Sequence, residues 1–150
     1  MLINNNMSDT NEVKMNPEQN REVEFQEIAK QNFSFWNEAL LTGKKEEVAK
    51  LYADGATFLP TMSSEFEKGQ SGAKNYFQHF LEKNPESKVV NGVVQILGDD
   101  SYLHSGMYNF KVGPDDNRQV AEARFTFVWK KNKAGEWKII HHHSSAKPNA

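Results

Sequence analysis

Three consecutive histidines near the C-terminus, His141, His142 and His143, are the residues of this sequence best suited to chemistry. Alternate side chains of a strand lie on the same face, so His141 and His143 would project together and His142 would project to the opposite face. Two imidazoles on one face can act as an acid/base pair near neutral pH or ligate a metal ion. The same side chains also suit half-buried strand positions, hydrogen-bonded to neighbours or across an interface, and we favour this second interpretation.

A metal site would need a third or fourth ligand, and His104 is the only other imidazole expected on the sheet. The sequence has no cysteine and no carboxylate–histidine metal motif. It also has no Ser-His-Asp signature, phosphate loop or calcium loop. We therefore expect no metal ion and no cofactor, and we assign no catalytic residue.

Aromatic residues with polar tips form a second candidate group. Trp36, Tyr76 and Tyr108 could line an apolar pocket with a few polar groups, which is the usual composition of a small-ligand site. They could equally form an ordinary aromatic core whose hydroxyl groups reach its rim. Glu122 and Arg124, two apart on one expected strand, suit either an ion pair across an interface or a solvated surface pair.

Composition limits the possible partners. The 150 residues suit one domain, and 18 basic against 20 acidic residues leave no basic excess to attract nucleic acid. No apolar stretch reaches the length of a membrane span. The absence of cysteine excludes disulfides. We expect a cytoplasmic protein that binds neither nucleic acid nor a membrane.

The elements that position these residues can be read from caps, turns and periodicity. Residues 1–16 are rich in Asn and poor in apolar residues, which predicts a disordered tail before a domain at 17–150. Asn16 and Pro17 favour the start of a long helix that ends at Gly43. Further helices are expected at 44–53 and 72–83, a short strand at 56–59, and strands at 88–97, 101–112, 118–131 and 136–145. Helices followed by hairpins predict an antiparallel α+β fold.

Four segments carry a resemblance to a known family. They are residues 36–43 (WNEALLTG), 51–57 (LYADGAT), 128–129 with 135–137 (VW, GEW), and 141–145 (HHHSS). They resemble the association domain of calcium/calmodulin-dependent protein kinase II and its bacterial stand-alone SgcJ/EcaC relatives, within the nuclear transport factor 2-like (SnoaL/cystatin-like) superfamily. The resemblance implies a cone in which about three helices wrap a curved antiparallel sheet around a pocket. It also implies a homodimer through the convex sheet face, or a ring of dimers.

The sequence departs from its relatives at positions that carry their chemistry. Buried arginines mark the association-domain pocket, and two of their positions are Tyr108 and Phe127 here. Ketosteroid isomerases resemble residues 51–57, but Pro60 occupies the position of their catalytic base and Trp36 that of their oxyanion tyrosine. Because proline cannot accept a proton, that chemistry is not available in the same form.

Strand parity predicts which residues face the pocket. A three-residue turn at 133–135 would pair Trp129 with Ile139, Phe127 with His141 and Phe125 with His143. The predicted pocket residues are Trp36, Tyr76, Tyr108, Phe127, His141 and His143. Arg124 and His142 are predicted on the opposite face, at the subunit interface.

These observations favour a self-associating, non-catalytic cone protein that holds a small ligand. The alternative is a cyclase, isomerase or dehydratase that acts on a small hydrophobic molecule through Tyr108, His141 and His143.

Overall fold

A computed structural model describes residues 14–149, so the predicted tail at 1–16 lies outside the described residues except for its last three positions. The elements, in chain order, are α1 (Pro17–Leu41), α2 (Lys45–Ala49), β1 (Tyr52–Leu59), β2 (Glu67–Lys68), α3 (Gly69–Phe80), the 3-10 turn η2 (Leu81–Lys83), β3 (Glu86–Gly98), β4 (Ser101–Val112), β5 (Gln119–Lys131) and β6 (Trp137–Ala146). None of the helices within residues 14–149 is long and apolar enough to cross a membrane.

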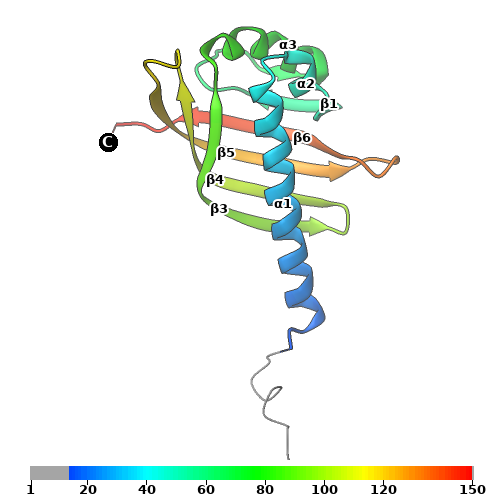
Figure 1. Cartoon of the computed structure of the whole chain (residues 1–150). Coiled ribbons are helices and arrows are strands. Elements are labelled where there is room, and N and C mark those ends of the chain that lie inside the picture. Colours follow the sequence, from blue (N-terminus) through cyan, green and yellow to red (C-terminus); the bar gives the residue numbers. More distant parts are fainter. Residues whose placement is uncertain (1–13, 150) are drawn as a thin grey trace, which may run out of the picture.

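Helix α1 starts where the sequence predicts. The side chain of Asn16 accepts a hydrogen bond from the backbone of Gln19 at 2.8 Å, and the Gln19 side chain accepts one from the backbone of Asn16 at 2.9 Å. This reciprocal capping box fixes the first turn. Phe25, Ala29, Trp36 and Leu40 recur on one side of the helix and are buried, so α1 lies along one face of the sheet (Figure 1).

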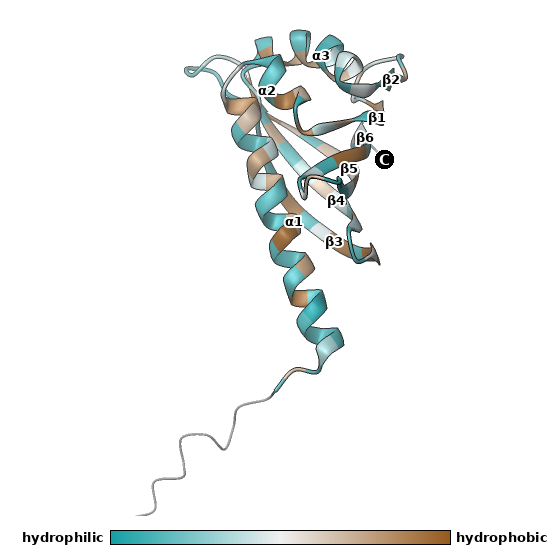
Figure 2. Cartoon of the chain, turned by 90° about the vertical axis from the view of Figure 1, so that its right-hand side faces the viewer, coloured by the Kyte–Doolittle hydropathy of each residue, from teal (hydrophilic) through white to brown (hydrophobic). Residues whose placement is uncertain are grey.

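The sheet is six-stranded, in the order β2-β1-β6-β5-β4-β3. Neighbouring strands are antiparallel except β1 and β6, which run parallel. The predicted α+β class is thereby confirmed, and the sheet is curved but not closed. Helices α2 and α3 lie near β1 at one end of the molecule, and α1 runs along one side of the sheet (Figures 1 and 2).

The core lies between α1, α3 and the inner face of the sheet, and aromatic rings dominate it. The largest fully buried side chains include Trp36, Trp129, Tyr52, Tyr102, Tyr108, Phe58, Phe77 and Phe127. Strands β4 and β5 supply inward-facing rings at alternate positions, as the predicted period of two requires.

The register between β5 and β6 differs from the prediction on the far side of the Trp129–Ile139 pair, from Val128 to Ala123. Trp129 does pair with Ile139, but the pairing then shifts by one residue at a β-bulge. Phe127 consequently pairs with His142, not His141, and Phe125 pairs with Ser144. One extra residue in one strand reverses the facing of every residue beyond it. The predicted pairings of Phe127 and Phe125 are therefore wrong.

Candidate functional site

His142 lies at the centre of the cone. Its side chain is 1% exposed, and its imidazole is stacked between two aromatic rings. Phe127 covers one face with ring centroids 4.0 Å apart, and Phe58 is stacked on it at 4.8 Å. The ring of Trp36 lies perpendicular to the same imidazole, with ring centroids 5.5 Å apart. The position combines β6, β5, β1 and α1, so it depends on the whole fold.

Hydrogen bonds connect His142 to both sides of the core. The Trp36 indole donates to the Tyr52 hydroxyl at 3.2 Å, and that hydroxyl lies 2.8 Å from His142 Nδ1. On the other side, His142 Nε2 lies 3.3 Å from the Tyr108 hydroxyl.

The connection continues outward from Tyr108. Its hydroxyl donates to Ser144 Oγ at 2.5 Å, and Ser144 Oγ is hydrogen-bonded in turn to Thr61 Oγ1. We call the set Trp36, Tyr52, His142, Tyr108, Ser144 and Thr61 the relay. It runs from the buried side of α1 to the loop after β1.

Burial keeps the relay neutral. Desolvation lowers the pKa of His142 well below its usual value, and the neighbouring His141 and His143 lower it further. Desolvation also raises the pKa of the Tyr52 and Tyr108 hydroxyls above their usual value. Near neutral pH the interior therefore holds hydrogen-bonding groups without a charge.

The deep interior has almost no free space. The cavity beside the relay, bounded by Trp36, Phe58, Phe77, Tyr108 and His142, has a volume of about 10 Å³. A cavity of that size holds about one water molecule. The aromatic side chains fill the part of the cone where the sequence predicted a ligand.

A much larger cavity, of about 670 Å³, opens at the end of the cone beside α3 and the loop after β1. We call it the mouth. Its apolar lining comes from Tyr76, Phe80, Phe110, Val112, Ala121, Ala123 and Ala146, and its polar rim includes Thr61, Glu65, Glu67, Asn75, His79, Lys83 and Glu122. It shares Thr61, Tyr76, Phe80 and Phe110 with the small inner cavity, so the relay ends at the mouth.

The structure brings together four of the six predicted pocket residues. Trp36, Tyr108 and Phe127 surround His142 in the interior, and Tyr76 lines the mouth and donates to the backbone carbonyl of Thr61 at 3.1 Å.

His141 and His143 lie on the opposite face of the sheet from this group, because the bulge reverses their facing. His141 is half-buried, with Nδ1 2.7 Å from the Thr57 hydroxyl, and burial lowers its pKa. His143 is exposed. The face assigned to these two residues from the sequence is wrong.

The two predicted interface residues are also separated. Arg124 is exposed on the outer face of the sheet, where its Nε donates to Ser145 Oγ at 3.3 Å. His142 is buried within the chain instead, so its predicted place beside Arg124 is wrong. The cause is again the single inserted residue between Ile139 and His141.

Sequence reasoning missed Tyr52, Ser144 and Thr61. Residues 44–53 were expected to be helical, which hid Tyr52 at the start of β1. Ser144 faces inward only because of the bulge, and Thr61 lies in a loop whose path no periodicity describes. The sequence did offer one signal for these residues, namely the hydroxyl side chains at the end of the segment 141–145 (HHHSS) and directly after Pro60.

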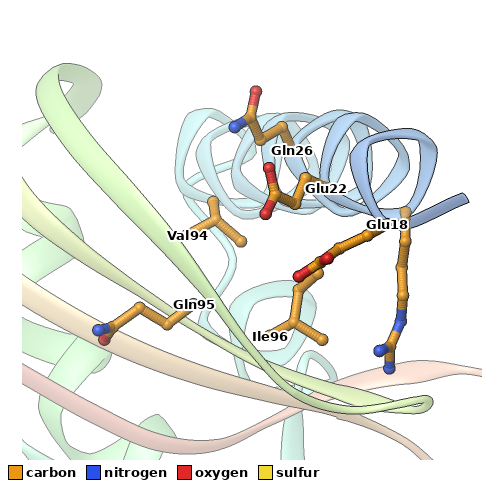
Figure 3. A pocket seen from close by; sticks show the side chains of 7 residues that line it. Glu18, Glu22, Gln26, Val94, Gln95 and Ile96 are labelled. Atoms are coloured by element: carbon orange, nitrogen blue, oxygen red, sulfur yellow. The ribbon is translucent and has the colours of Figure 1, made fainter. Parts of the chain in front are cut away.

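A separate groove follows the contact between α1 and β3. One part, of about 500 Å³, lies beside Glu18 and Glu22 of α1 and Val94 and Ile96 of β3 (Figure 3). The next part, of about 700 Å³, shares Gln26 and Val94 with it and reaches Ser87 and His104. Ser87 Oγ and His104 Nδ1 are buried without a hydrogen-bond partner among the described residues.

Comparisons with solved structures give the fold and a relative. A protein from Xanthomonas campestris, assigned to the calcium/calmodulin dependent protein kinase II association domain, is 40% identical with a TM-score of 0.77, covering 83% of this chain and 88% of that one. An NTF2-like protein with a cystatin-like fold from Novosphingobium aromaticivorans is 9% identical with a TM-score of 0.71, covering 89% and 88%. A protein from Parabacteroides distasonis assigned as a ketosteroid isomerase is 19% identical with a TM-score of 0.59, covering 77% and 84%.

The last two similarities, below 25% identity, show the NTF2-like fold alone. No curated protein matches the chain. The family described as the calcium/calmodulin dependent protein kinase II association domain matches residues 24–148. With this match over most of its length, the chain belongs to the calcium/calmodulin dependent protein kinase II association domain family.

Proposed function

We propose that the chain is a self-associating domain that forms at least a dimer through the outer face of its sheet and catalyses no reaction. The observation that carries this proposal is the outer face itself. Helix α1 packs on the inner face, and Figure 2 shows it along one side of β3–β6, with α2 and α3 at the β1 end of the sheet. Cross-strand pairing places Val93, Leu103, Met107, Arg124, Thr126, Val128, His141 and His143 together on the outer face.

This face is partly apolar. Val93 is 61% exposed on the edge strand β3, and Leu103 and Met107 of β4 and Val128 of β5 are partly exposed. An uncovered apolar area rimmed by polar residues is typical of a protein interaction surface. A symmetric dimer would place two such faces against each other, since the same patch serves both subunits. Membership of an association-domain family supports the same assignment.

Light scattering tests self-association directly. We expect a mass of at least twice the chain mass of 17.2 kDa at micromolar concentration. Val93→Asp places a charge on the outer face at an exposed position, so it should shift the protein towards monomer without unfolding it. Val23→Asp, at a residue of α1 that is 44% exposed, is the matched control and should leave the mass unchanged. A wild-type monomer would refute the proposal.

We also propose that the mouth binds a small molecule. It has a volume of about 670 Å³ and an apolar lining with polar groups at the rim, which suit a small-molecule site. Catalysis in the interior lacks support, because a cavity of about 10 Å³ cannot admit a substrate and His141 and His143 lie on the other face.

Blocking the mouth tests the binding proposal. Ala121 is exposed and lines the mouth, so Ala121→Trp should fill part of the cavity and abolish fragment binding observed by NMR. Ala134→Trp, in the exposed β5–β6 turn, should leave binding intact. Equal binding by both variants would exclude the mouth as the site.

A further inference from the structure

The relay has a direction, and Trp36 sets it. The indole Nε1–H can only donate, and it donates to the Tyr52 hydroxyl at 3.2 Å. The remaining neighbour of that hydroxyl is His142 Nδ1 at 2.8 Å, so the single Tyr52 hydrogen goes there. If Nδ1 carried a proton instead, the fully buried Tyr52 hydroxyl would accept twice and its own hydrogen would lack an acceptor, which costs free energy.

The direction continues through the imidazole. With Nδ1 as an acceptor, the neutral ring carries its proton on Nε2 and donates to the Tyr108 hydroxyl at 3.3 Å. Tyr108 then donates to Ser144 Oγ at 2.5 Å. Ser144 is buried, and its own hydrogen is satisfied only if it donates to Thr61 Oγ1. Each hydroxyl from Tyr52 to Ser144 thus accepts one hydrogen bond and donates one.

Thr61 is where the relay reaches the mouth. Its Oγ1 accepts from Ser144, so its own hydrogen is free to point away from the interior. Thr61 is half-buried and lines the mouth. The hydroxyl of Tyr76, beside it, donates its hydrogen bond to the backbone carbonyl of Thr61 at 3.1 Å. The relay therefore offers the mouth a hydroxyl donor, and this donor has no acceptor among the described residues.

The charges at the rim restrict which kind of hydrogen-bond acceptor a ligand can bring to the Thr61 hydroxyl. Among the described residues, the lining includes the carboxylates of Glu65, Glu67 and Glu122, one lysine, Lys83, and one imidazole, His79. Glu122 has a surface partner in Lys147 at 3.7 Å, and buried Glu67 accepts hydrogen bonds from the neutral amide of Asn75. An anion entering the mouth would meet net negative charge. A neutral acceptor, such as a ketone, ester or ether oxygen, would not.

We infer that the mouth selects a neutral molecule with an apolar body and one hydrogen-bond acceptor, which Thr61 Oγ1 recognises as the donor at the end of the relay. This inference rests on the proposed ligand-binding function of the mouth. It adds the class of ligand and the group that selects it. Carboxylates and plain hydrocarbons should bind less well than a carbonyl compound of the same size.

Three probes with one ring separate these classes: acetophenone, ethylbenzene and benzoate. We expect acetophenone to bind about tenfold more tightly than ethylbenzene, as one hydrogen bond allows, and benzoate to bind most weakly. Dissociation constants come from NMR titration of labelled full-length protein. Thr61→Val keeps the shape of the side chain and should remove the preference for acetophenone over ethylbenzene. Thr61→Ser should retain it.

A second measurement tests the direction without any ligand. Nitrogen NMR of the His142 side chain distinguishes the two neutral tautomers, and we expect the proton on Nε2. A proton on Nδ1 would overturn the inference. So would equal binding of acetophenone and ethylbenzene, although the mouth would then remain a ligand site. Failure of all three probes to bind would overturn both the inference and the binding function.

Discussion

The imidazole of His142 lies face to face with Phe127, with ring centroids 4.0 Å apart and ring planes within 17°. Phe58 covers the opposite face at 4.8 Å and 7°. Both ring nitrogens contact tyrosine hydroxyls, and within residues 14–149 neither contacts a carboxylate. Protonation would therefore place an unpaired charge inside an aromatic core. The arrangement makes His142 a neutral hydrogen-bonding link, and it also makes folding sensitive to pH.

Stability should fall as the pH falls below about 6.5, the usual pKa of histidine in an unfolded chain. Burial lowers the pKa of His142 in the folded protein, so in this range the unfolded chain binds a proton that the folded chain does not. Burial also lowers the pKa values of His104 and His141, so both histidines contribute to the loss of stability in the same direction. The loss from one such histidine is at most about 1.4 kcal/mol per pH unit. Urea unfolding at pH 7.5, 6.5 and 5.5 measures it, and a constant free energy of unfolding would contradict this account.

Replacing His143 provides the control for that experiment. His143 is exposed on the outer face and lies outside the relay. His143→Gln should therefore keep most of the wild-type dependence of unfolding free energy on pH between 7.5 and 5.5, because burial is the main cause of the lowered pKa of His142 and His141 and the charge of His143 adds only to it. Both proteins are compared at one concentration, because His143 shares the face proposed for self-association. If the variant lost the acid dependence, the group responsible for it would be His143 on the outer face and not the buried His142.

The alkaline limit depends on the tyrosines. Burial raises the pKa of all four, Tyr52, Tyr76, Tyr102 and Tyr108, above their usual value of about 10. Above pH 10 the unfolded chain loses protons that the folded chain keeps, so stability is retained below that pH and falls above it. Tyrosinate absorbance should therefore rise together with unfolding, followed by circular dichroism. Ionisation of any tyrosine at pH 10 in the folded protein would contradict the burial of that hydroxyl.

Local signals predicted most of the elements. The Asn16–Pro17 start of α1 and the alternation along β4 and β5 depend on neighbouring residues, and the structure agrees with both. The hairpin after β5 was also predicted correctly as far as the pairing of Trp129 with Ile139. Tyr52 was assigned to a helix because its own neighbours suit one, but pairing with β6 places it in a strand.

The site was harder to predict because it depends on one inserted residue. The bulge at Ile140 places His142 and Ser144 inside and His141 and His143 outside, and alternation alone gives the reverse. The aromatic residues Trp36, Tyr108 and Phe127 lie in the interior, because their apolar surface requires burial in any register. How completely they fill the cone depends on ring packing between distant segments, which no single stretch of sequence encodes.

Two buried serines should respond in opposite ways to the same substitution. Ser87 and Ser144 are 5% and 6% exposed, so Ser→Ala removes a hydroxyl from a similarly buried site in each case. Ser87 Oγ has no hydrogen-bond partner among the described residues, and replacing an unpaired polar group should raise stability by up to about 1 kcal/mol. Ser144→Ala removes the link between Tyr108 and Thr61 and leaves the fully buried Tyr108 hydroxyl without its acceptor, which should cost about 1–3 kcal/mol. Urea unfolding at pH 7.5 measures both changes. Equal losses of stability in the two variants would show that the relay contributes no more than any buried hydroxyl, and that Ser87 has a partner of its own.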